Sequence, residues 1–339
     1  MPVQPRDLGT SRRNCVRRIV RAAHRVRSTR PQILRRSARW LQHFGGMTPT
    51  KLLCPIDFSP GADNALRTAV RLARARDAEL VLLHAWQAPM LAMAGEPELP
   101  AGILRELADD AERSLAAAVV EAKQLGATRV TSSLVKGVPW DQIVETLRTD
   151  SAYELVVMGT HGRSGVTRFL LGSVAEKVVR HAPCSVLAVH EADPATAFRR
   201  VLCPVDFSES AHHAVDLAGR FVAPGGDVTL LHVLELPLLR EGEASGAELA
   251  VTLDERATGR LVAWAAELRA KVAVPVTTRT RLGSAGVQIL AVLDEAPPFE
   301  LVVIGSHGRT GLRRALLGSV AEKIVRHAPC AVLVARRRI

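Results

Sequence analysis

The second half of the chain repeats the first half closely enough to predict two similar domains in tandem. Leu52–Ser59 and Val201–Ser208 agree at six of eight positions, and Leu155–Leu187 and Leu301–Leu333 agree at 25 of 33 positions. The two copies lie about 147 residues apart, whereas the repeats of solenoid proteins are roughly 20–50 residues long. Each copy therefore has the length of a whole domain, and the duplication constrains the fold to two related units.

Each copy alternates strand and helix patterns, which is typical of an α/β fold with a parallel sheet. In the first copy, Ser59 is expected to cap a helix that has Pro60 in its first turn. Further helices are expected near 101–125, 139–149 and 174–181. The five expected strands are Lys51–Asp57, Leu80–Trp86, Arg129–Val135, a run that ends at Met158, and Ser185–Val189. In a doubly wound sheet of order 3-2-1-4-5, ligands bind beyond the carboxyl ends of strands one and four.

The domain boundaries are expected where this pattern stops and restarts. The first domain is predicted at 50–190, a short linker at 191–198 and the second domain at 199–336. Residues 1–46 are rich in arginine, end in Gly45-Gly46 and lack the pattern of a domain. Three interpretations stay open for them: a basic tail for nucleic acid or anionic lipid, an amphipathic import-like segment, or residues upstream of a start at Met47.

The net charge of +11 comes entirely from the first 50 residues, which hold twelve arginines and one acid. The rest of the chain is neutral, so nucleic-acid binding is expected, if at all, only through the arginine-rich segment. No membrane contact is expected, because no apolar run approaches the roughly 20 residues of a spanning helix. Four of the five cysteines lie beside apolar strands and are expected to be small buried thiols, which fits the cytoplasm: Cys54, Cys184, Cys203 and Cys330.

A glycine-rich stretch follows the fourth strand of each copy and is expected to enclose an anion. Gly159–Ser173 reads G-T-H-G-R-S-G-V-T-R-F-L-L-G-S, and Gly305–Ser319 reads G-S-H-G-R-T-G-L-R-R-A-L-L-G-S. Ser173 and Ser319 each precede a glutamate by three residues, which predicts a capping box with the serines at helix N-caps. A helix N-terminus presents unpaired N–H groups and a partial positive charge, which suit a phosphate.

An acid closes the first strand of each copy at the same crevice. Asp57 and Asp206 can accept hydrogen bonds from a ribose hydroxyl or an adenine amine. Glycines such as Gly159, Gly162 and Gly172 let the backbone approach a polyphosphate without an intervening Cβ. A nucleotide satisfies both ends of the crevice.

Several of these residues also have purely structural interpretations, which the sequence leaves open. The acids can be helix-entry or turn carboxylates, and the serines can act as caps alone. Arg163 and Arg309 can meet a phosphate or be solvated, and His307 can be a surface histidine without chemistry, like its counterpart in the first copy. His84 and His232 close apolar strands and are expected to be structural, and no metal site is expected.

As a set, these motifs resemble the universal stress protein family in its tandem-domain form. The resemblance rests on Cys-Pro-(Ile/Val)-Asp-Phe-Ser at strand one, Leu-Leu-His at strand two, Gly-(Thr/Ser)-His-Gly-Arg, Leu-Leu-Gly-Ser-Val-Ala-Glu-Lys and Arg-His-Ala-Pro-Cys. It covers residues 50–336 and leaves the arginine-rich segment without a counterpart. It implies two Rossmann-like domains of the adenine nucleotide α-hydrolase-like type, each with a five-stranded parallel sheet of order 3-2-1-4-5 flanked by helices.

The resemblance further implies ATP as the ligand, with or without Mg²⁺, because family members that keep the glycine motif bind ATP. It implies that the fifth strands, Ser185–Val189 and Ala331–Ala335, join the domains as a pseudo-dimer within the chain, and it leaves room for a homodimer. In the first domain it places Pro55, Ile56, Asp57 and Ala85 around the nucleoside, Met158 and Gly159 near the ribose, and Gly162, Gly172, Ser173 and Val174 at the phosphates, with Arg163 as a further candidate. The second site would use Pro204, Val205, Asp206, Val233, Ile304, Gly305, Gly308, Gly318, Ser319 and Val320, with Arg309 as a further candidate.

The sequence indicates an ATP-binding regulator or sensor of the stress response rather than a fast enzyme. Fast phosphoryl transfer needs a cation at the β- and γ-phosphates, a metal ligand and a group that orients the attacking water. The Walker sequence is absent, and Lys177 and Lys323 lie a full turn beyond the glycine loops. A slow ATPase, a nucleotidyl transferase and a protein-interaction scaffold with incidental ATP binding stay as alternatives, and the sequence does not identify the regulatory partner.

Overall fold

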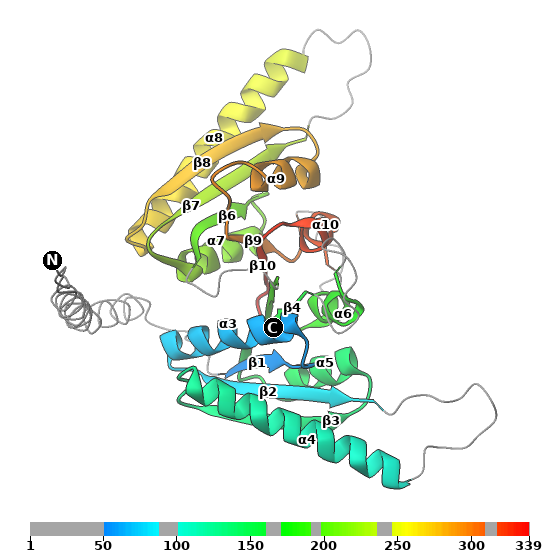
Figure 1. The fold of residues 1–339 in the computed structure, drawn as a ribbon. Coiled ribbons are helices and arrows are strands. Elements are labelled where there is room, and N and C mark those ends of the chain that lie inside the picture. Colours follow the sequence, from blue (N-terminus) through cyan, green and yellow to red (C-terminus); the bar gives the residue numbers. More distant parts are fainter. Residues whose placement is uncertain are drawn as a thin grey trace, which may run out of the picture. The chain divides into compact units, whose positions relative to one another are not determined.

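The computed structural model describes residues 51–87, 101–160, 171–190, 198–235, 246–308 and 317–338. Figure 1 shows two successive sets of alternating strands and helices. The first domain contains β1 (Lys51–Pro55), α3 (Pro60–Arg76), β2 (Glu79–Trp86), α4 (Ala101–Gln124), β3 (Val130–Lys136), α5 (Pro139–Thr149), β4 (Tyr153–Gly159), α6 (Ser173–His181) and β5 (Ser185–Val189). The second contains β6 (Phe198–Pro204), α7 (Glu209–Phe221), β7 (Val222–Leu234), α8 (Gly246–Lys271), β8 (Val276–Leu282), α9 (Ala285–Leu293), β9 (Leu301–Gly305), α10 (Ser319–His327) and β10 (Ala331–Ala335). The arginine-rich segment 1–46 and the predicted linker, apart from Phe198, fall outside the described residues.

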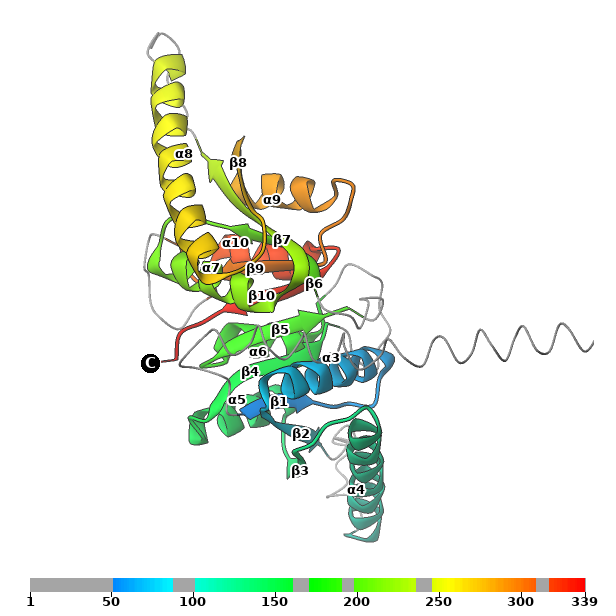
Figure 2. The same cartoon turned by 90° about the vertical axis from the view of Figure 1, so that its left-hand side faces the viewer.

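The described strands form one ten-stranded sheet in the order β3-β2-β1-β4-β5-β10-β9-β6-β7-β8. Neighbours within each domain are parallel, so the predicted 3-2-1-4-5 order is confirmed in both halves. The domains meet through β5 and β10, which pair antiparallel with Leu187 opposite Leu333. Figure 2 shows these two strands side by side. The joining of the fifth strands that the resemblance implied is therefore present.

The core lies on both faces of the sheet, because successive residues of a strand point to opposite faces. On β2, Leu80 and Leu82 cluster with residues of α3 and α4, whereas Val81 and Leu83 cluster with residues of α5 and α6. The second domain repeats this division, with α7 and α8 on one face and α9 and α10 on the other. Fully burying one such side chain is worth about 1.5–3 kcal/mol, so both faces contribute to each domain's stability.

Charged side chains extend the junction between the domains beyond the β5–β10 pair. Arg180 of α6 contacts Glu322 of α10 at 3.2 Å, and Arg326 of α10 contacts Glu176 of α6 at 3.4 Å. The Arg336 guanidinium, just after β10, donates to three backbone carbonyls at the end of α6. A cation at a helix C-terminus is stabilising because the free carbonyls carry partial negative charge. The second domain thus caps a helix of the first.

The four cysteines that the structure describes are buried thiols, which confirms their interpretation as small core residues. Burial raises the pKa of Cys54 and Cys203, and it raises the pKa of Cys184 to about 12. These thiols therefore stay protonated at neutral pH and are poor nucleophiles. Among the described helices, none combines the length and the apolar character that a membrane crossing requires.

Candidate functional site

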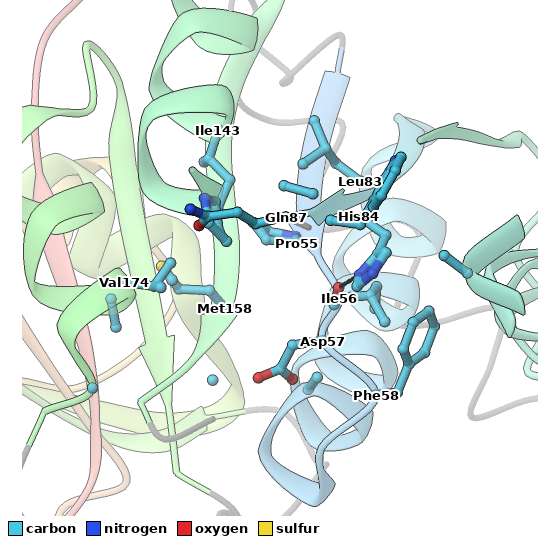
Figure 3. A pocket seen from close by; sticks show the side chains of 18 of the residues that line it. Pro55, Ile56, Asp57, Phe58, Leu83, His84, Gln87, Ile143, Met158 and Val174 are labelled. Atoms are coloured by element: carbon cyan, nitrogen blue, oxygen red, sulfur yellow. Dashed lines mark hydrogen bonds between the residues drawn. The ribbon is translucent and has the colours of Figure 1, made fainter. Parts of the chain in front are cut away.

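A cavity of about 790 Å³ opens at the carboxyl edge of the first domain's sheet. Its walls come from the ends of β1, β2 and β4 and from α4, α5 and α6, and Figure 3 shows it from close by. The volume falls within the roughly 300–1,000 Å³ of small-molecule sites. Of the residues predicted from sequence, it is lined by Pro55, Ile56, Asp57, Ala85, Met158, Gly159, Gly172, Ser173 and Val174. The structure therefore brings together side chains from three strands and one helix that are far apart in sequence.

Three predicted residues, Gly162, Arg163 and Arg309, lie outside the described residues. In the second domain, the described candidates follow the ends of β6, β7 and β9 and the start of α10: Pro204, Val205, Asp206, Val233, Ile304, Gly305, Gly308, Gly318, Ser319 and Val320. A Cβ on Gly308 would lie 3.1 Å from Oδ2 of Asp206, so the second glycine of the motif adjoins the acid that follows strand one. The two ends of the predicted crevice meet there.

Asp57 lies in a turn two residues beyond β1, whereas the sequence analysis placed it at the strand's end. Its Oδ1 accepts hydrogen bonds from the Ser59 backbone N–H at 3.1 Å and from the Ser59 hydroxyl at 2.6 Å. The same hydroxyl oxygen accepts from the N–H of Ala62 at 3.2 Å and caps α3, as predicted. Asp57 is thus a turn carboxylate that uses its Oδ1 within the turn. Figure 3 shows its carboxyl group pointing toward the side of the cavity where Met158 lies.

The predicted capping box at α6 is wrong, because Gly172 rather than Ser173 is the N-cap residue. The carbonyl of Gly172 accepts the first helical bond, from the N–H of Glu176 at 2.9 Å, and its own N–H donates to the carbonyl of Thr160 at 2.7 Å. Among the residues that the structure describes, no side chain caps this helix. Gly318 of α10 repeats this arrangement with the carbonyl of Ser306. Gly172 occupies the N-cap position because its N–H donates to the carbonyl of Thr160, which holds the end of the glycine loop against the end of β4. Ser173 is therefore the first residue of the helix and is not its N-cap.

The first N–H groups of α6 therefore lack a capping side chain at the wall of the cavity. Gly172, Ser173, Val174 and Ala175 all line it. The N–H groups of a helix's first turn have no partner within the helix, and they carry the positive end of its dipole. As far as the described residues go, no side chain competes with an anion at this wall of the cavity.

Gly159 also serves the packing of the domain, and its approach to a polyphosphate stays a prediction. A Cβ at this position would lie 2.8 Å from the carbonyl carbon and oxygen of Gly61 in α3. In the second domain, a Cβ on Gly305 would lie 2.6 Å from Oγ and 2.9 Å from the carbonyl carbon of Ser210 in α7. These glycines let the first helix of each domain close against the fourth strand, although Gly159 also lines the cavity.

The histidines that close the second strands are structural, as predicted. Nδ1 of His84 donates to the carbonyl of Ile56 at 2.6 Å, and Nδ1 of His232 donates to the carbonyl of Val205 at 2.7 Å. Each bond ties the end of the second strand to the turn that follows the first. His307 lies at the start of the second glycine loop, where burial lowers its pKa, so it is neutral at pH 7.

Lys177 of α6 is not among the residues that line the cavity. Its ammonium lies 5.1 Å from the centre of the Trp140 ring of α5. An ammonium in this position is held over the face of the ring by the aromatic quadrupole.

Part of the cavity wall was not predicted from the sequence, and it comes mainly from α4 and from the other face of β2. The missed residues are Phe58, Ala62, Leu83, His84, Trp86, Gln87, Leu107, Asp110, Ala111, Ser114, Pro139, Ile143, Thr160 and Ala175. The α4 members recur at helical spacing, which is the signal that could have placed them on one face. The sequence pattern does not show which part of the structure this face of α4 lies against.

Comparisons with known proteins agree with this architecture. The sequence model described as the universal stress protein family matches residues 49–190 and again 197–336. A universal stress protein of Mycobacterium tuberculosis (strain ATCC 25618 / H37Rv) is 32% identical over 305 residues, which cover 83% of this chain and 95% of that protein. One from Mycolicibacterium smegmatis is 30% identical over 306 residues, which cover 85% and 97%.

Among solved structures, a universal stress protein from Archaeoglobus fulgidus superposes with a TM-score of 0.61 at 23% identity. The match covers 86% of this chain and all of that one. At this identity the likeness concerns the fold alone, and it extends over both domains.

Proposed function

The chain belongs to the universal stress protein family, and on that premise we propose that it is an ATP-binding regulator of the stress response with one nucleotide site in each domain. The observation that carries the proposal is the N-terminus of α6, which has no side-chain cap and opens into a cavity of about 790 Å³. The acid that follows β1 lines the same cavity. An adenine nucleotide has an anionic end and a hydrogen-bonding end that match these two features.

The phosphates would bind at the start of α6, where Gly172, Ser173 and Val174 line the cavity. The N–H groups of Ser173 and Val174 can donate to phosphate oxygens, whereas that of Gly172 already donates to the carbonyl of Thr160. The hydroxyl of Ser173 is a further donor, since it does not serve as the N-cap. Gly162 and Arg163 of the glycine loop would complete this end.

The nucleoside would bind between the ends of β1 and β2, where Pro55 and Ala85 offer apolar contact. Asp57 would accept hydrogen bonds from a hydroxyl or amine of the nucleoside, because Oδ1 is held by the turn and keeps the carboxylate in a fixed orientation. Fixing a group before the ligand arrives lowers the entropy cost of binding.

Binding without rapid turnover fits the charges around the cavity. Lys177 lies over Trp140 and is not among the residues that line the cavity. Asp110, the other acid that lines the cavity, comes from α4 rather than from the elements around the start of α6. Within the described residues of the first domain, neither a lysine nor a carboxylate comes from the elements around the start of α6 that line the cavity, so hydrolysis would be slow. ATP binding would act by stabilising one state of the protein.

The test is to measure the nucleotide content and the ATP stoichiometry of the full chain. Protein purified without added ligand is denatured, and the released nucleotides are identified by chromatography. Calorimetry on nucleotide-free protein should then resolve two ATP sites per chain. The absence of ATP binding by active, folded protein would refute the proposal, and multiple turnovers against excess ATP would favour an enzyme instead of a regulator.

A further inference from the structure

The cavity of the first domain extends over both faces of the sheet, and only one face is used by the proposed nucleotide site. Ala85 lies on the face of β2 that carries Leu83 and α5, whereas His84 and Trp86 lie on the face that carries Leu82 and α4. We name the part on this second face the Phe58 lobe, lined by Phe58, His84, Trp86, Leu107, Asp110 and Ser114. Figure 3 shows Phe58 and His84 across β1 from Ile143 and Val174.

Phe58 is held in the lobe by a backbone conformation that large side chains rarely adopt. Its φ is 61°, in the left-handed region, and its ring lies on that of His84 with centroids 4.6 Å apart. The residue as a whole is nonetheless 38% exposed. A residue in this region costs about 1–3 kcal/mol unless the surroundings impose it, and here the bonds between Asp57 and Ser59 do so. The turn thus presents an aromatic face to the lobe.

The second domain contains the same turn but covers the equivalent ring. Phe207 has a φ of 64° and lies on His232, again with centroids 4.6 Å apart. The guanidinium of Arg260 lies over its ring, 3.9 Å from the centre, and Trp264 packs edge-on at 5.3 Å. Phe207 accordingly packs against the hydrophobic core. The lobe of the second domain is occupied by its own side chains.

The difference between the domains comes from two positions on the long helix. Counting back from β3 and β8, which begin at Val130 and Val276, Arg260 corresponds to Ser114 and Trp264 to Ala118. The first domain therefore has Ser114 where the second domain has the guanidinium of Arg260. It has Ala118 where the second domain has the indole of Trp264. Its α4 also carries an acid at the lobe, Asp110.

We propose that the Phe58 lobe is a second binding site of the first domain, which takes a small molecule carrying a guanidinium or another flat cation. The ligand's cation would lie over Phe58 as Arg260 lies over Phe207, in the same chain and on the same kind of turn. Asp110 would provide the opposite charge. Its present partner Arg113 lies on the same exposed surface of α4, and such surface pairs are weak enough to yield to a ligand.

A stacked cation of this kind is worth about 0.5–2 kcal/mol depending on its exposure, so a ligand that also meets a carboxylate should bind measurably. The probe is agmatine, which has a guanidinium and a flexible amine, titrated into the nucleotide-free full chain by NMR or calorimetry. Ser114→Arg should place a guanidinium over Phe58 and weaken agmatine binding at least tenfold. Phe58→Leu should do the same, whereas the matched change Phe207→Leu should leave the affinity unchanged.

The second domain allows a gain-of-binding experiment. Arg260→Ser with Trp264→Ala removes the two side chains that cover Phe207, and Arg256→Asp places an acid at the position that corresponds to Asp110. In the Ser114→Arg background, this triple change should restore agmatine binding. Melting temperatures show whether each variant is folded, and Phe58→Leu supplies the test if Ser114→Arg does not fold. Failure of the folded parent to bind agmatine, or full binding by Phe58→Leu, would overturn the assignment. Displacement of agmatine by ATP would also overturn it, because the lobe would then belong to the nucleotide. ATP binding is measured separately, so a failure here leaves the proposed function standing.

Discussion

Replacing Gly172 and Gly318 by alanine should weaken ATP binding while the fold stays stable. Their φ values are −60° and −65°, which alanine adopts without strain. A Cβ on Gly318 would lie 3.5 Å from the carbonyl oxygen of Ser306, at ordinary contact distance. Loss of unfolded-state freedom should stabilise each site by about 0.4–1 kcal/mol, and the poorer N-cap preference of alanine should cost roughly 0.5–1 kcal/mol. The two effects nearly cancel.

The effect on the ligand should be larger, because the new methyl groups enter the space between the helix start and the loop. At Gly318, the next nearest atoms are Cα of His307 at 3.7 Å and the backbone nitrogen of Gly308 at 3.8 Å. A phosphate at this helix start would compete with the methyl group for that space. We expect the double variant to bind ATP more than about tenfold more weakly, which corresponds to about 1.4 kcal/mol.

Gly159→Ala with Gly305→Ala is the matched control from the same motif. A Cβ on Gly159 would lie only 2.8 Å from the backbone of Gly61, so α3 would have to move away from β4. Crowding of this kind costs about 1–3 kcal/mol, which in a protein of this size lowers the melting temperature by roughly 2–4 °C per kcal/mol. The control should therefore lose stability before any ligand is added.

Thermal unfolding without nucleotide and calorimetry with ATP decide between the two roles. The Gly172 and Gly318 variant should keep the parent's melting temperature within about 3 °C and lose affinity for ATP. The Gly159 and Gly305 variant should lose melting temperature, and its loss of ATP affinity should be the smaller effect. If the first variant melts as low as the second, or binds ATP like the parent, its glycines are structural and the crevice assignment is wrong.

Three further predictions follow from the same contacts. Asp57→Asn with Asp206→Asn keeps an acceptor for the turn serines but removes the charge, so affinity for adenosine and for ATP should both fall; equal binding by variant and parent would move the nucleoside elsewhere. Arg336→Ala leaves the last carbonyls of α6 without their donor and should cost about 1–3 kcal/mol, seen as a melting temperature several degrees lower; an unchanged value would show that this contact adds nothing to stability. The pKa of Asp150 is lowered by its hydrogen bonds with the N–H of Ala152 and with Lys51. The stability that Asp150 adds to the fold is therefore present above the ordinary carboxyl pKa of about 4 and is lost as pH falls further. Asp150→Asn should make acid unfolding less steep in that range, and an acid profile identical to the parent's would contradict this.

The sequence alone was enough to predict the order and type of the elements. Apolar runs with β-branched residues marked the buried strands, and Ser59-Pro60 marked the start of the first helix, because these signals depend on a few neighbouring residues. The duplication then predicted a second domain with the same sheet order, which the pairing of β6 to β10 confirms. Most of the first domain's predicted site residues also line one cavity, because the carboxyl ends of parallel strands share an edge.

Tertiary structure decided what each of these residues does. Gly159 and Gly172 belong to one sequence motif, yet the first packs against α3 and the second closes a loop onto Thr160. Ser173 matched a capping box, but the N–H of Glu176 donates to the carbonyl of Gly172, so the N-cap is Gly172, one residue before the serine. The open lobe at Phe58 and its covered counterpart at Phe207 share one local sequence pattern and differ in a distant helix. Roles of this kind depend on contacts between residues far apart in the chain, which local patterns do not contain.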